Sequence, residues 1–448
     1  MKYKAVKPPE WFAKGSIYQI NPRTFSREGT LRAIIETLPE LAELGFKVVY
    51  LCPIFEEDDS ADPAFWSSRQ KKSNTGNPKN PYRINNFFKI DPEYGNADDL
   101  RELISKSHEL DMRVMLDLVY LHTGPNSPIL KTHPEFACQD KNGKIKCSEW
   151  NFPHLDFNCG GLKEYLWSNM VYYISEFDVD GFRCDSGDQV PLDFWEEGRR
   201  RIRLVKPDAV MLNEGSRWNY LLQAFDATYC FDWHETLYGI FSGKYTAEKL
   251  REGHESVALK APYGMTAVRD IDNHDTVTDW PARTELVAGH DGMEMIEVIN
   301  YLIDGIPMVY AGNEIADAAK LSLFANRFYP GEYEFTDRSA LTGKESLRRR
   351  EIIKKLNQMK KSSDILCSGE TVWLDTTSPE SVIAFKRTLG ARQILFIGNT
   401  AASRLSCTAY SDFPLTEASA VFESREKAEI LPDGSLLLPS HGYIVLEI

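Results

Sequence analysis

Short apolar runs alternate with amphipathic segments from about residue 16 to about residue 361. Apolar runs bounded by turn residues are typical of buried strands, whereas apolar residues three or four positions apart are typical of helices that cover a core. Eight runs predict strands, at Ser16–Asn21, Lys47–Cys52, Arg113–Asp117, Gly181–Asp185, Ala209–Asn213, Ala227–Phe231, Met265–Asp270 and Pro307–Ala311. Helical patterns lie between them, at Leu31–Leu44, Ala97–Leu110, Gly161–Phe177, Leu192–Val205, Ala247–Ser256 and Met293–Leu302. The alternation predicts an α/β protein with a (β/α)8 barrel.

Two connections are too long to be simple turns. The first runs from Pro53 to about Asn96 after the second predicted strand, and the second runs from His122 to about Cys159 after the third. Loops that follow the strands of such a barrel rise over its carboxyl-terminal face, where the active sites of this architecture lie. We therefore expect both segments to form the walls of a cleft.

The pattern changes after about Cys367 to short alternating runs, which predict a small antiparallel β domain. Three parts are expected: a barrel formed by residues 1–121 and 160–364, a loop domain inserted at 122–159 after the third strand, and a C-terminal β-sandwich at 365–448. Because no flexible linker separates them, we expect the β domain to pack firmly on the barrel.

The composition narrows the range of partners. The 448 residues carry a formal net charge of −14, which argues against nucleic acid or an anionic membrane as a partner, since both bind clustered Lys and Arg. A neutral sugar is compatible with this charge. The chain contains no apolar stretch of signal-peptide or membrane-spanning length, so we expect a cytoplasmic protein. The composition does not indicate the oligomeric state.

Eight cysteines are spread over nearly the whole chain and form no recognisable disulfide framework. Cys138, Cys147 and Cys159 lie near His133 and His154, but their intervals match no standard zinc-ligand spacing. We favour free thiols in a reducing compartment over a zinc site, and expect neither a metal nor a cofactor.

Acidic residues at the ends of apolar strands are the most informative feature, because a partly buried carboxylate costs free energy unless it is paired or used. Four strand ends carry such groups: Asp117 with His122, Arg183 with Asp185, Glu214, and His274 with Asp275. Positions i and i+2 of a strand point the same way, so Arg183 and Asp185 should share one side of the sheet.

The spacing of these acids matches the barrel repeat of about 31 residues per unit. Glu214 lies 29 residues after Asp185, and Asp275 lies 61 residues after Glu214, close to two units. Asp117 precedes Asp185 by 68 residues, which is one unit plus the long third loop. The four acids should therefore converge on one mouth of the barrel.

Such a group of acids with an Arg and two His suggests either glycosidic bond cleavage or metal binding. Glycosidases use one carboxylate to attack the anomeric carbon and a second, protonated carboxyl to donate to the leaving oxygen. Asp185 suits the first role because Arg183 should hold it ionised, and Glu214 suits the second because neighbouring carboxylates and burial should raise its pKa.

At this point the sequence resembles the α-amylase family of glycoside hydrolases, of the glycoside hydrolase family 13 type. Four motifs occur in the family's order: DLVYLH, GFRCD, the Glu of MLNEG, and DNHD. The segments GSIYQINPRTF, PYRINNFFKIDPEYG and GIPMVYAGNE are also similar to family sequences. The resemblance covers nearly the whole chain.

The resemblance implies a role for each residue. It makes Asp185 the nucleophile, Glu214 the acid/base, and Asp275 a third carboxylate that grips the sugar hydroxyls. Substrate-binding roles fall to Tyr82, which would stack under the sugar ring, and to Asp117, His122, Arg183 and His274.

Two departures from the family pattern matter. Leu121 stands where the family usually has a calcium-binding Asn, and an apolar side chain cannot ligate calcium, so we expect that calcium site to be absent. Asp188 and Gln189 stand where many amylases carry a Lys-His pair that contacts the sugar beyond the cleaved bond, which makes endo-acting α-amylase activity less certain.

The favoured interpretation is a retaining α-glycoside hydrolase that acts on malto-oligosaccharides or related α-glucans through a covalent intermediate on Asp185. An α-glucan transglycosylase or isomerase using the same residues is the main alternative, because a sugar hydroxyl can intercept the intermediate instead of water. A non-catalytic carbohydrate-binding protein and a metal-dependent barrel hydrolase are further alternatives. Linkage, chain length and endo or exo action cannot be read from the sequence.

Overall fold

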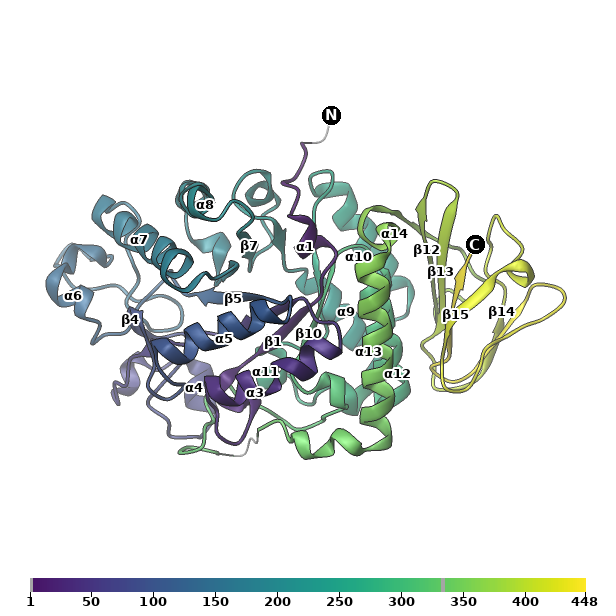
Figure 1. Ribbon diagram of the computed structural model, residues 1–448, viewed down its shortest axis with the longest axis horizontal. Coiled ribbons are helices and arrows are strands. Elements are labelled where there is room, and N and C mark those ends of the chain that lie inside the picture. The colour runs from purple at the N-terminus through teal and green to yellow at the C-terminus, as the bar shows by residue number, and fades with distance from the viewer. Residues whose placement is uncertain (1–2, 332–334) are drawn as a thin grey trace.

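Eight parallel strands form a barrel at the centre of the molecule (Figure 1). The structure is a computed structural model that describes residues 3–331 and 335–448. The barrel strands are β1 (Ile17–Ile20), β2 (Val48–Leu51), β5 (Arg113–Leu118), β6 (Gly181–Cys184), β7 (Val210–Asn213), β8 (Ala227–Thr228), β9 (Val268–Arg269) and β10 (Ile306–Tyr310). They lie in the order β8-β7-β6-β5-β2-β1-β10-β9, and a parallel bridge between Thr228 and Ala267 joins the two ends. The predicted (β/α)8 barrel is confirmed, although β8 and β9 are shorter than expected.

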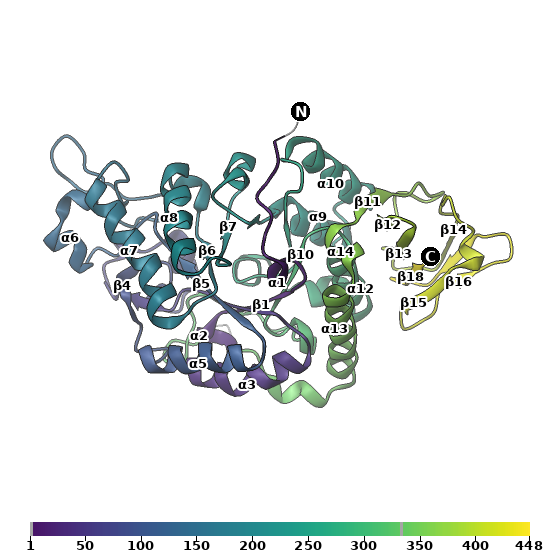
Figure 2. The same ribbon diagram turned by 45° about the horizontal axis from the view of Figure 1, so that its top comes forward.

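Helices surround the barrel (Figure 2). The helices that follow barrel strands in the chain are α3 (Leu31–Glu43), α5 (Ala97–Glu109), α7 (Gly160–Phe177), α8 (Leu192–Val205), α9 (Phe231–Phe241), α10 (Glu248–Lys260), α12 (Thr284–Leu302) and α13 (Lys344–Ser362). Shorter helices are α1 (Glu10–Ala13), α2 (Pro22–Phe25), α4 (Ser68–Lys72), α6 (Pro128–Thr132), α11 (Thr276–Asp279) and α14 (Asp364–Ser368).

Local signals explain where the first large helices begin. The Thr30 hydroxyl accepts a hydrogen bond from the backbone N–H of Ala33 at the start of α3. A capping box opens α5, in which Asn96 and Asp99 each accept a hydrogen bond from the other's backbone N–H. Caps of this kind satisfy donors that the first helical turn leaves unpaired.

Alternation along the strands separates an inner core from an outer one. Val48 and Met115 point into the barrel and join an apolar plug, whereas Val49 and Leu116 point outward to the surrounding helices. Successive side chains of a strand point to opposite faces, so the next inward position along a strand lies nearer the barrel mouth. On β2 that position is Tyr50, which begins the polar layer of the site.

Both long loops follow barrel strands as expected. The loop after β2 contains the hairpin of β3 (Phe55–Glu57) and β4 (Ile84–Ile90), together with α4, and the loop after β5 contains α6. The fully buried guanidinium of Arg83 organises the first loop by donating to the backbone carbonyls of Phe65, Asp58, Ser60 and Pro78. An irregular loop with its buried carbonyls satisfied in this way can act as a fixed wall.

The C-terminal part forms two antiparallel sheets. Its strands are β11 (Glu370–Trp373), β12 (Val382–Leu389), β13 (Arg392–Asn399), β14 (Leu405–Cys407), β15 (Ser419–Glu423), β16 (Glu429–Ile430), β17 (Leu436–Leu438) and β18 (Tyr443–Glu447). On β12, Val382 and Ala384 pack in the core between the sheets, whereas Ile383 and Phe385 join the main core of the protein. The central part of the five-stranded sheet is thus buried on both faces, which explains how the β domain packs firmly against the barrel helices.

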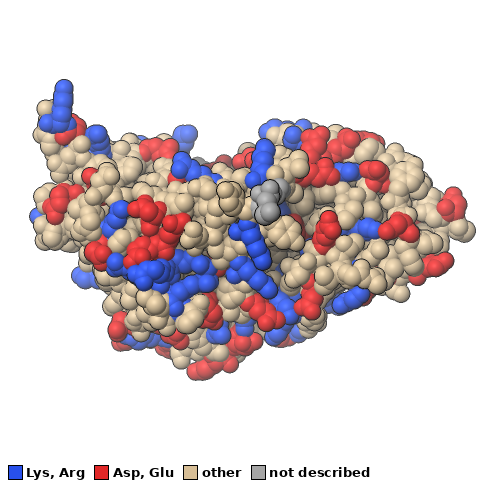
Figure 3. All heavy atoms as spheres, turned by 90° about the horizontal axis from the view of Figure 1, so that it is seen from above, with Lys and Arg blue, Asp and Glu red and all other residues tan. Residues whose placement is uncertain are grey.

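The face of the molecule that carries the amino terminus shows positive and negative side chains interspersed (Figure 3). None of the helices within residues 3–331 and 335–448 combines the length and apolar composition that crossing a lipid bilayer requires.

A substitution in β6 tests the close packing of the barrel strands. A Cβ atom at Gly181 would lie 2.5 Å from the backbone oxygen of Val210 on β7. We expect Gly181→Ala to lower the free energy of unfolding by about 1–3 kcal/mol or more, because a backbone atom cannot move aside cheaply. The measurement is the midpoint of thermal or urea unfolding.

Gly160→Ala is the matched control, because nothing lies within 4 Å of a Cβ built at that exposed helix start. It should be neutral or stabilise the protein by up to about 1 kcal/mol. Equal destabilisation by the two substitutions would contradict this account of the barrel packing.

Candidate active site

The sequence-predicted site residues come together at the carboxyl ends of the barrel strands. A cavity of about 90 Å³ opens there. Five of the eight predicted residues line it: Tyr82, His122, Asp185, Glu214 and Asp275. The other three are buried behind them, in contact with the lining residues: Asp117, Arg183 and His274.

One guanidinium holds three carboxylates. Nη1 of Arg183 lies 2.7 Å from Oδ1 of Asp117 and 3.1 Å from Oδ1 of Asp185, and Nη2 donates to Oε1 of Glu214. Arg183 is 0% exposed, and a fully buried charge is tolerated only when it is paired and hydrogen-bonded. Around Arg183, one fixed positive charge therefore faces three acidic groups.

Asp117 is fully engaged by its neighbours. Its second oxygen, Oδ2, accepts hydrogen bonds from the hydroxyls of Tyr50 at 2.7 Å and Tyr82 at 3.1 Å. Because Oδ1 of Asp117 is bound to Arg183, neither oxygen of this carboxylate is free to face the cavity. Its position suits an anchor for Arg183 and Tyr82 better than a reacting group.

Asp185 and Glu214 behave as a coupled pair of acids. Burial raises the pKa of Asp185 well above its ordinary value, and the nearby Glu214 raises it further. Arg183 opposes both effects without outweighing them, so the prediction that Arg183 alone holds Asp185 ionised is wrong. Burial also raises the pKa of Glu214, although Arg183 opposes this. Two acids that disfavour each other's ionisation hold one proton between them over a wide pH range. The pair can therefore supply one carboxylate and one carboxylic acid at the same time.

The backbone around Asp185 and Glu214 fixes their relative position. The N–H of Ser186, a residue with φ of 44°, donates to Oε2 of Glu214 at 2.7 Å. Behind Glu214, Oδ2 of Asp188 accepts from the backbone N–H groups of Ser216 at 2.5 Å and Arg217 at 2.8 Å. Asp188 thus binds the loop that follows β7, so its side chain faces the backbone of that loop.

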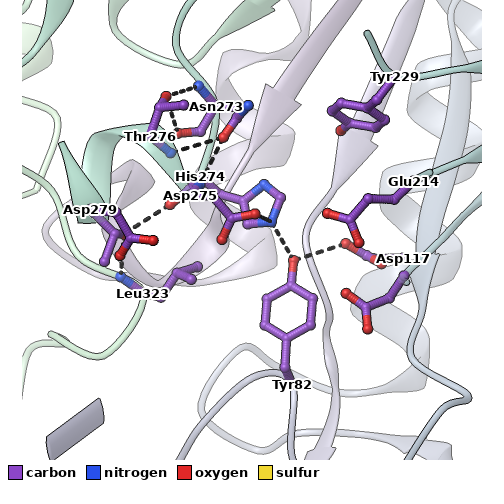
Figure 4. A network of polar contacts seen from close by, with 12 residues as sticks. Tyr82, Asp117, Glu214, Tyr229, Asn273, His274, Asp275, Thr276, Asp279 and Leu323 are labelled. Carbon is purple, nitrogen blue, oxygen red and sulfur yellow. Dashed lines mark hydrogen bonds and ion pairs between the residues drawn. The ribbon is translucent and has the colours of Figure 1, made fainter. Parts of the chain in front are cut away.

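His274 is held in one tautomer. The backbone N–H of His274 donates to Oε1 of Gln19, which leaves the amide nitrogen of Gln19 to donate to Nδ1 of the ring at 2.9 Å. Nε2 then carries the ring proton and donates it to the Tyr82 hydroxyl at 2.7 Å, which in turn donates to Asp117 (Figure 4). Burial lowers the pKa of His274, so the ring is neutral.

His122 is also a neutral imidazole. Its Nε2 donates to the backbone carbonyl of Tyr82 at 2.9 Å, and burial lowers its pKa to about 3. The side chain of Ser148, from the loop after β5, lies 3.4 Å from Nδ1. The ring therefore lies between the two long loops with its protonation state fixed.

Asp275 forms the opposite side of the cavity from Glu214, beyond Tyr82 and Asp117 (Figure 4). Its Oδ1 lies 2.8 Å from Nη1 of Arg69. Burial opposes its ionisation, but the guanidinium groups of Arg69 and Arg183 outweigh that effect and lower its pKa. Asp275 is thus a permanent carboxylate, in contrast to the proton-sharing pair.

Several residues of the site were not predicted from the sequence. They are Gln19, Tyr50, Arg69, Trp150, Phe152, Ser186, Leu323 and Phe324. Gln19 and Tyr50 could have been found from the two-residue period of β1 and β2, which places them one inward position nearer the mouth than Ile17 and Val48. Arg69 could not have been found in this way, because its position depends on the path of a long loop.

No group of three or more His, Cys, Asp or Glu side chains able to hold a metal ion occurs within residues 3–331 and 335–448. All eight cysteines are free thiols. Leu121, at the position where a calcium ligand was considered, is 0% exposed and belongs to the main apolar core.

Comparison with known proteins finds similarity to the α-amylase family. Residues 9–144 match the family model of the α-amylase catalytic domain. A cyclomaltodextrinase from Bacillus sp. is 27% identical over 374 residues, covering 69% of this chain and 60% of the relative. An intracellular maltogenic amylase from Bacillus subtilis is 24% identical over 441 residues, covering 87% of this chain and 69% of the relative. The chain thus spans about two thirds of the length of these relatives.

Solved structures share the fold at low identity. A maltogenic α-amylase from Thermotoga neapolitana superposes with a TM-score of 0.81 at 23% identity, over 97% of this chain and 99% of that one. An α-amylase from Lactobacillus plantarum gives 0.79 at 22% identity, over 98% of this chain and 100% of that one. Both comparisons extend over the barrel and the C-terminal β domain.

The site predicts which imidazole rings stay neutral. Because burial lowers the pKa of His122 to about 3, its ring should remain uncharged between about pH 5 and 8. The lowered pKa of His274 should keep that ring uncharged at neutral pH. His274 should show the Nε2-protonated tautomer. Long-range ¹H–¹⁵N NMR of the ring nitrogens measures both properties.

His234 provides an internal contrast in the same experiment. Burial lowers its pKa, but Asp270, 3.2 Å away, outweighs burial and raises it. Protonation of His122 at a higher pH than His234 would contradict the geometry described here.

Proposed function

This chain belongs to the α-amylase family of glycoside hydrolases, and we propose that it cleaves α-glucosidic bonds in malto-oligosaccharides or related α-glucans with retention of anomeric configuration. The observation that carries the proposal is the Arg183 guanidinium, which binds Asp185 on one nitrogen and Glu214 on the other. A close pair of carboxyl groups is the arrangement used by retaining glycosidases, whereas inverting enzymes hold theirs further apart to admit a water molecule.

In the first step, a carboxylate oxygen of Asp185 attacks the anomeric carbon of the bound sugar. The bond between that carbon and the glycosidic oxygen breaks, and the proton of Glu214 passes to the leaving oxygen. The products of this step are a glycosyl ester on Asp185 and a shortened sugar with a free hydroxyl. The pKa of both acids is raised, so the pair holds the proton that this step delivers.

In the second step, a water molecule gives a proton to the Glu214 carboxylate as its oxygen attacks the anomeric carbon. The ester bond breaks, Asp185 leaves as a carboxylate, and the α-anomer is released. Asp275 has a lowered pKa, so it stays negative throughout. A fixed negative charge there suits both the sugar hydroxyls and the positive charge that develops on the ring.

Transglycosylation is the second candidate. The arrangement of Asp185 and Glu214 supports transglycosylation equally well, because a sugar hydroxyl can replace water in the second step. An α-1,4-glucan:maltose-1-phosphate maltosyltransferase from Picrophilus torridus is 24% identical over 423 residues, covering 88% of this chain and 62% of that relative. An isomerase would transfer the glycosyl group back to the same leaving sugar.

Incubation with maltotetraose, maltoheptaose, isomaltotriose and sucrose tests the proposal. Polarimetry or NMR during the first turnovers should detect new reducing ends in the α form. Products longer than the starting sugar would favour the transferase. No turnover of any of these sugars, or release of β-anomers, would contradict the proposed function.

Replacement of the acid/base should affect substrates according to their leaving groups. Glu214→Gln should lower kcat/KM on maltoheptaose by about 10²–10⁴-fold, because the leaving oxygen is no longer protonated. On α-glucosyl fluoride, whose leaving group needs little help, the loss should be much smaller. Asp185→Asn should lose several orders of magnitude on both substrates, and a similar loss on both for Glu214→Gln would contradict its role.

The pH profile follows from the same pair. Activity requires one proton on the pair, so it should fall at low pH, where both acids are protonated, and fall again at high pH, where both are ionised. With α-glucosyl fluoride, Glu214→Gln should abolish the alkaline fall of kcat/KM. An unchanged alkaline limb in that variant would assign the titration to another group.

A further inference from the structure

We propose that Arg69 closes the glycone end of the active-site pocket, so that the enzyme removes single sugar residues from the non-reducing ends of its substrates. This inference rests on the proposed glycosidase function and adds to it the position of the cleaved bond. It assigns to Arg69, on the short helix α4, a role in specificity.

The position of Arg69 follows from the order of the carboxylates across the site. Figure 4 shows Glu214 and Asp279 on opposite sides of Asp275. Because Glu214 protonates the leaving oxygen, the departing part of the substrate lies on its side. A glycone longer than one residue would have to continue on the other side, past Asp275. Arg69 lies there, bonded to both Asp275 and Asp279.

The contacts of Arg69 span two loops. Nη1 lies 2.8 Å from Oδ1 of Asp275, and Nε donates to Oδ1 of Asp279 at 2.9 Å. Asp275 and Asp279 follow β9, whereas Arg69 belongs to the loop that follows β2. Since Arg69 lines the pocket, the ion pairs of Arg69 with Asp275 and Asp279 lie across one end of it. We call these three side chains the bar.

One nitrogen of the bar has no protein partner. Nη2 of Arg69 is buried and makes no hydrogen bond within the described residues. Buried donors are nearly always satisfied in folded proteins, and an exception at a binding site indicates a group that the ligand supplies. Sugar hydroxyls are suitable acceptors. The bar thus has a donor available for the last residue of the glycone.

The bar is held by a wall of connected loops. The Ser67 hydroxyl caps α4, and the Gln70 side chain of this helix donates to the backbone carbonyl of Asn77 at 2.9 Å. The Asn77 side chain donates in turn to the carbonyl of Phe324 at 2.9 Å, in the segment after β10. The backbone N–H of Leu323 donates to the Thr278 hydroxyl. Three loops are therefore joined around this end of the pocket.

The size of the pocket supports a closed glycone end. Its volume of about 90 Å³ is well below the roughly 300–1,000 Å³ of pockets that enclose drug-sized ligands. A space of this size suits one sugar ring better than a chain of rings. On the side of Glu214, by contrast, Ser216 and Arg217 are exposed, so the leaving part of the substrate can extend into solvent.

A pair of substrates tests this inference directly. One is 4-nitrophenyl α-maltoheptaoside, and the other is the same compound with its non-reducing end blocked by a 4,6-O-ethylidene group. The wild-type enzyme should release glucose one unit at a time from the first and should leave the second intact. Arg69→Ala should raise the ratio of blocked to unblocked cleavage at least about tenfold, because the ratio removes any general effect of the substitution on Asp275.

Control variants separate the bar from overall folding. Lys72→Ala changes an exposed residue on the same helix and should keep the wild-type ratio. Asp279→Asn should shift the ratio in the same direction as Arg69→Ala. Thermal unfolding of each variant shows whether it is folded, and the Asp279 variant provides a second reading if Arg69→Ala does not fold.

The outcomes distinguish this inference from the proposed function. Wild-type cleavage of the blocked substrate, or maltose as the first product from the unblocked one, would overturn the closed end while leaving the glycosidase proposal intact. An Arg69→Ala ratio equal to wild type would also overturn it. If the wild-type enzyme did not cleave the unblocked substrate, the proposed glycosidase function, on which this inference rests, would itself be wrong.

Discussion

The buried guanidinium of Arg183 is the constraint on which the site depends. A charge that is 0% exposed requires carboxylate partners, and here they are Asp117, Asp185 and Glu214. One Arg cannot neutralise three acids. Burial, together with the excess negative charge, raises the pKa of Asp185 and Glu214 and so leaves a proton on the pair. The same arrangement fixes the geometry of the two groups and gives them different protonation states.

The barrel makes this arrangement possible by separating apolar and polar layers within one set of strands. Inward-facing residues such as Val48 and Met115 fill the lower barrel, and the next inward positions, Tyr50 and Asp117, form the base of the site. The loops then supply the walls. Arg83 fixes the loop after β2 through backbone carbonyls, which places α4 and Arg69 at the edge of the pocket.

The fold and the centre of the site were predictable from the sequence because both depend on short-range patterns. Alternating apolar runs predicted the eight strands, and acids at strand ends predicted that Asp117, Asp185, Glu214 and Asp275 would meet, since parallel strands bring their carboxyl ends to one edge. The pairing of Arg183 with Asp185 followed from the two-residue period of a strand. These inferences required no knowledge of the loops.

The rest of the site depends on long-range contacts. Arg69 and Asp279 are 210 positions apart in the chain, and no local pattern links them. The role of Asp188 was also hidden, because its acceptors are filled by backbone N–H groups of a loop after another strand. The short strands β8 and β9 and the small strands of the C-terminal domain likewise depend on tertiary packing more than on local propensity.

Direct detection of the covalent intermediate tests the central claim, that Asp185 and Glu214 divide the chemistry between them. Glu214→Gln should react with α-glucosyl fluoride to form the ester on Asp185 but hydrolyse it slowly, because no base activates the water. After rapid acid quenching and proteolysis, mass spectrometry should find one glucosyl unit on the peptide that contains Asp185. Turnover of the fluoride without any adduct, or an adduct on another residue, would contradict the account.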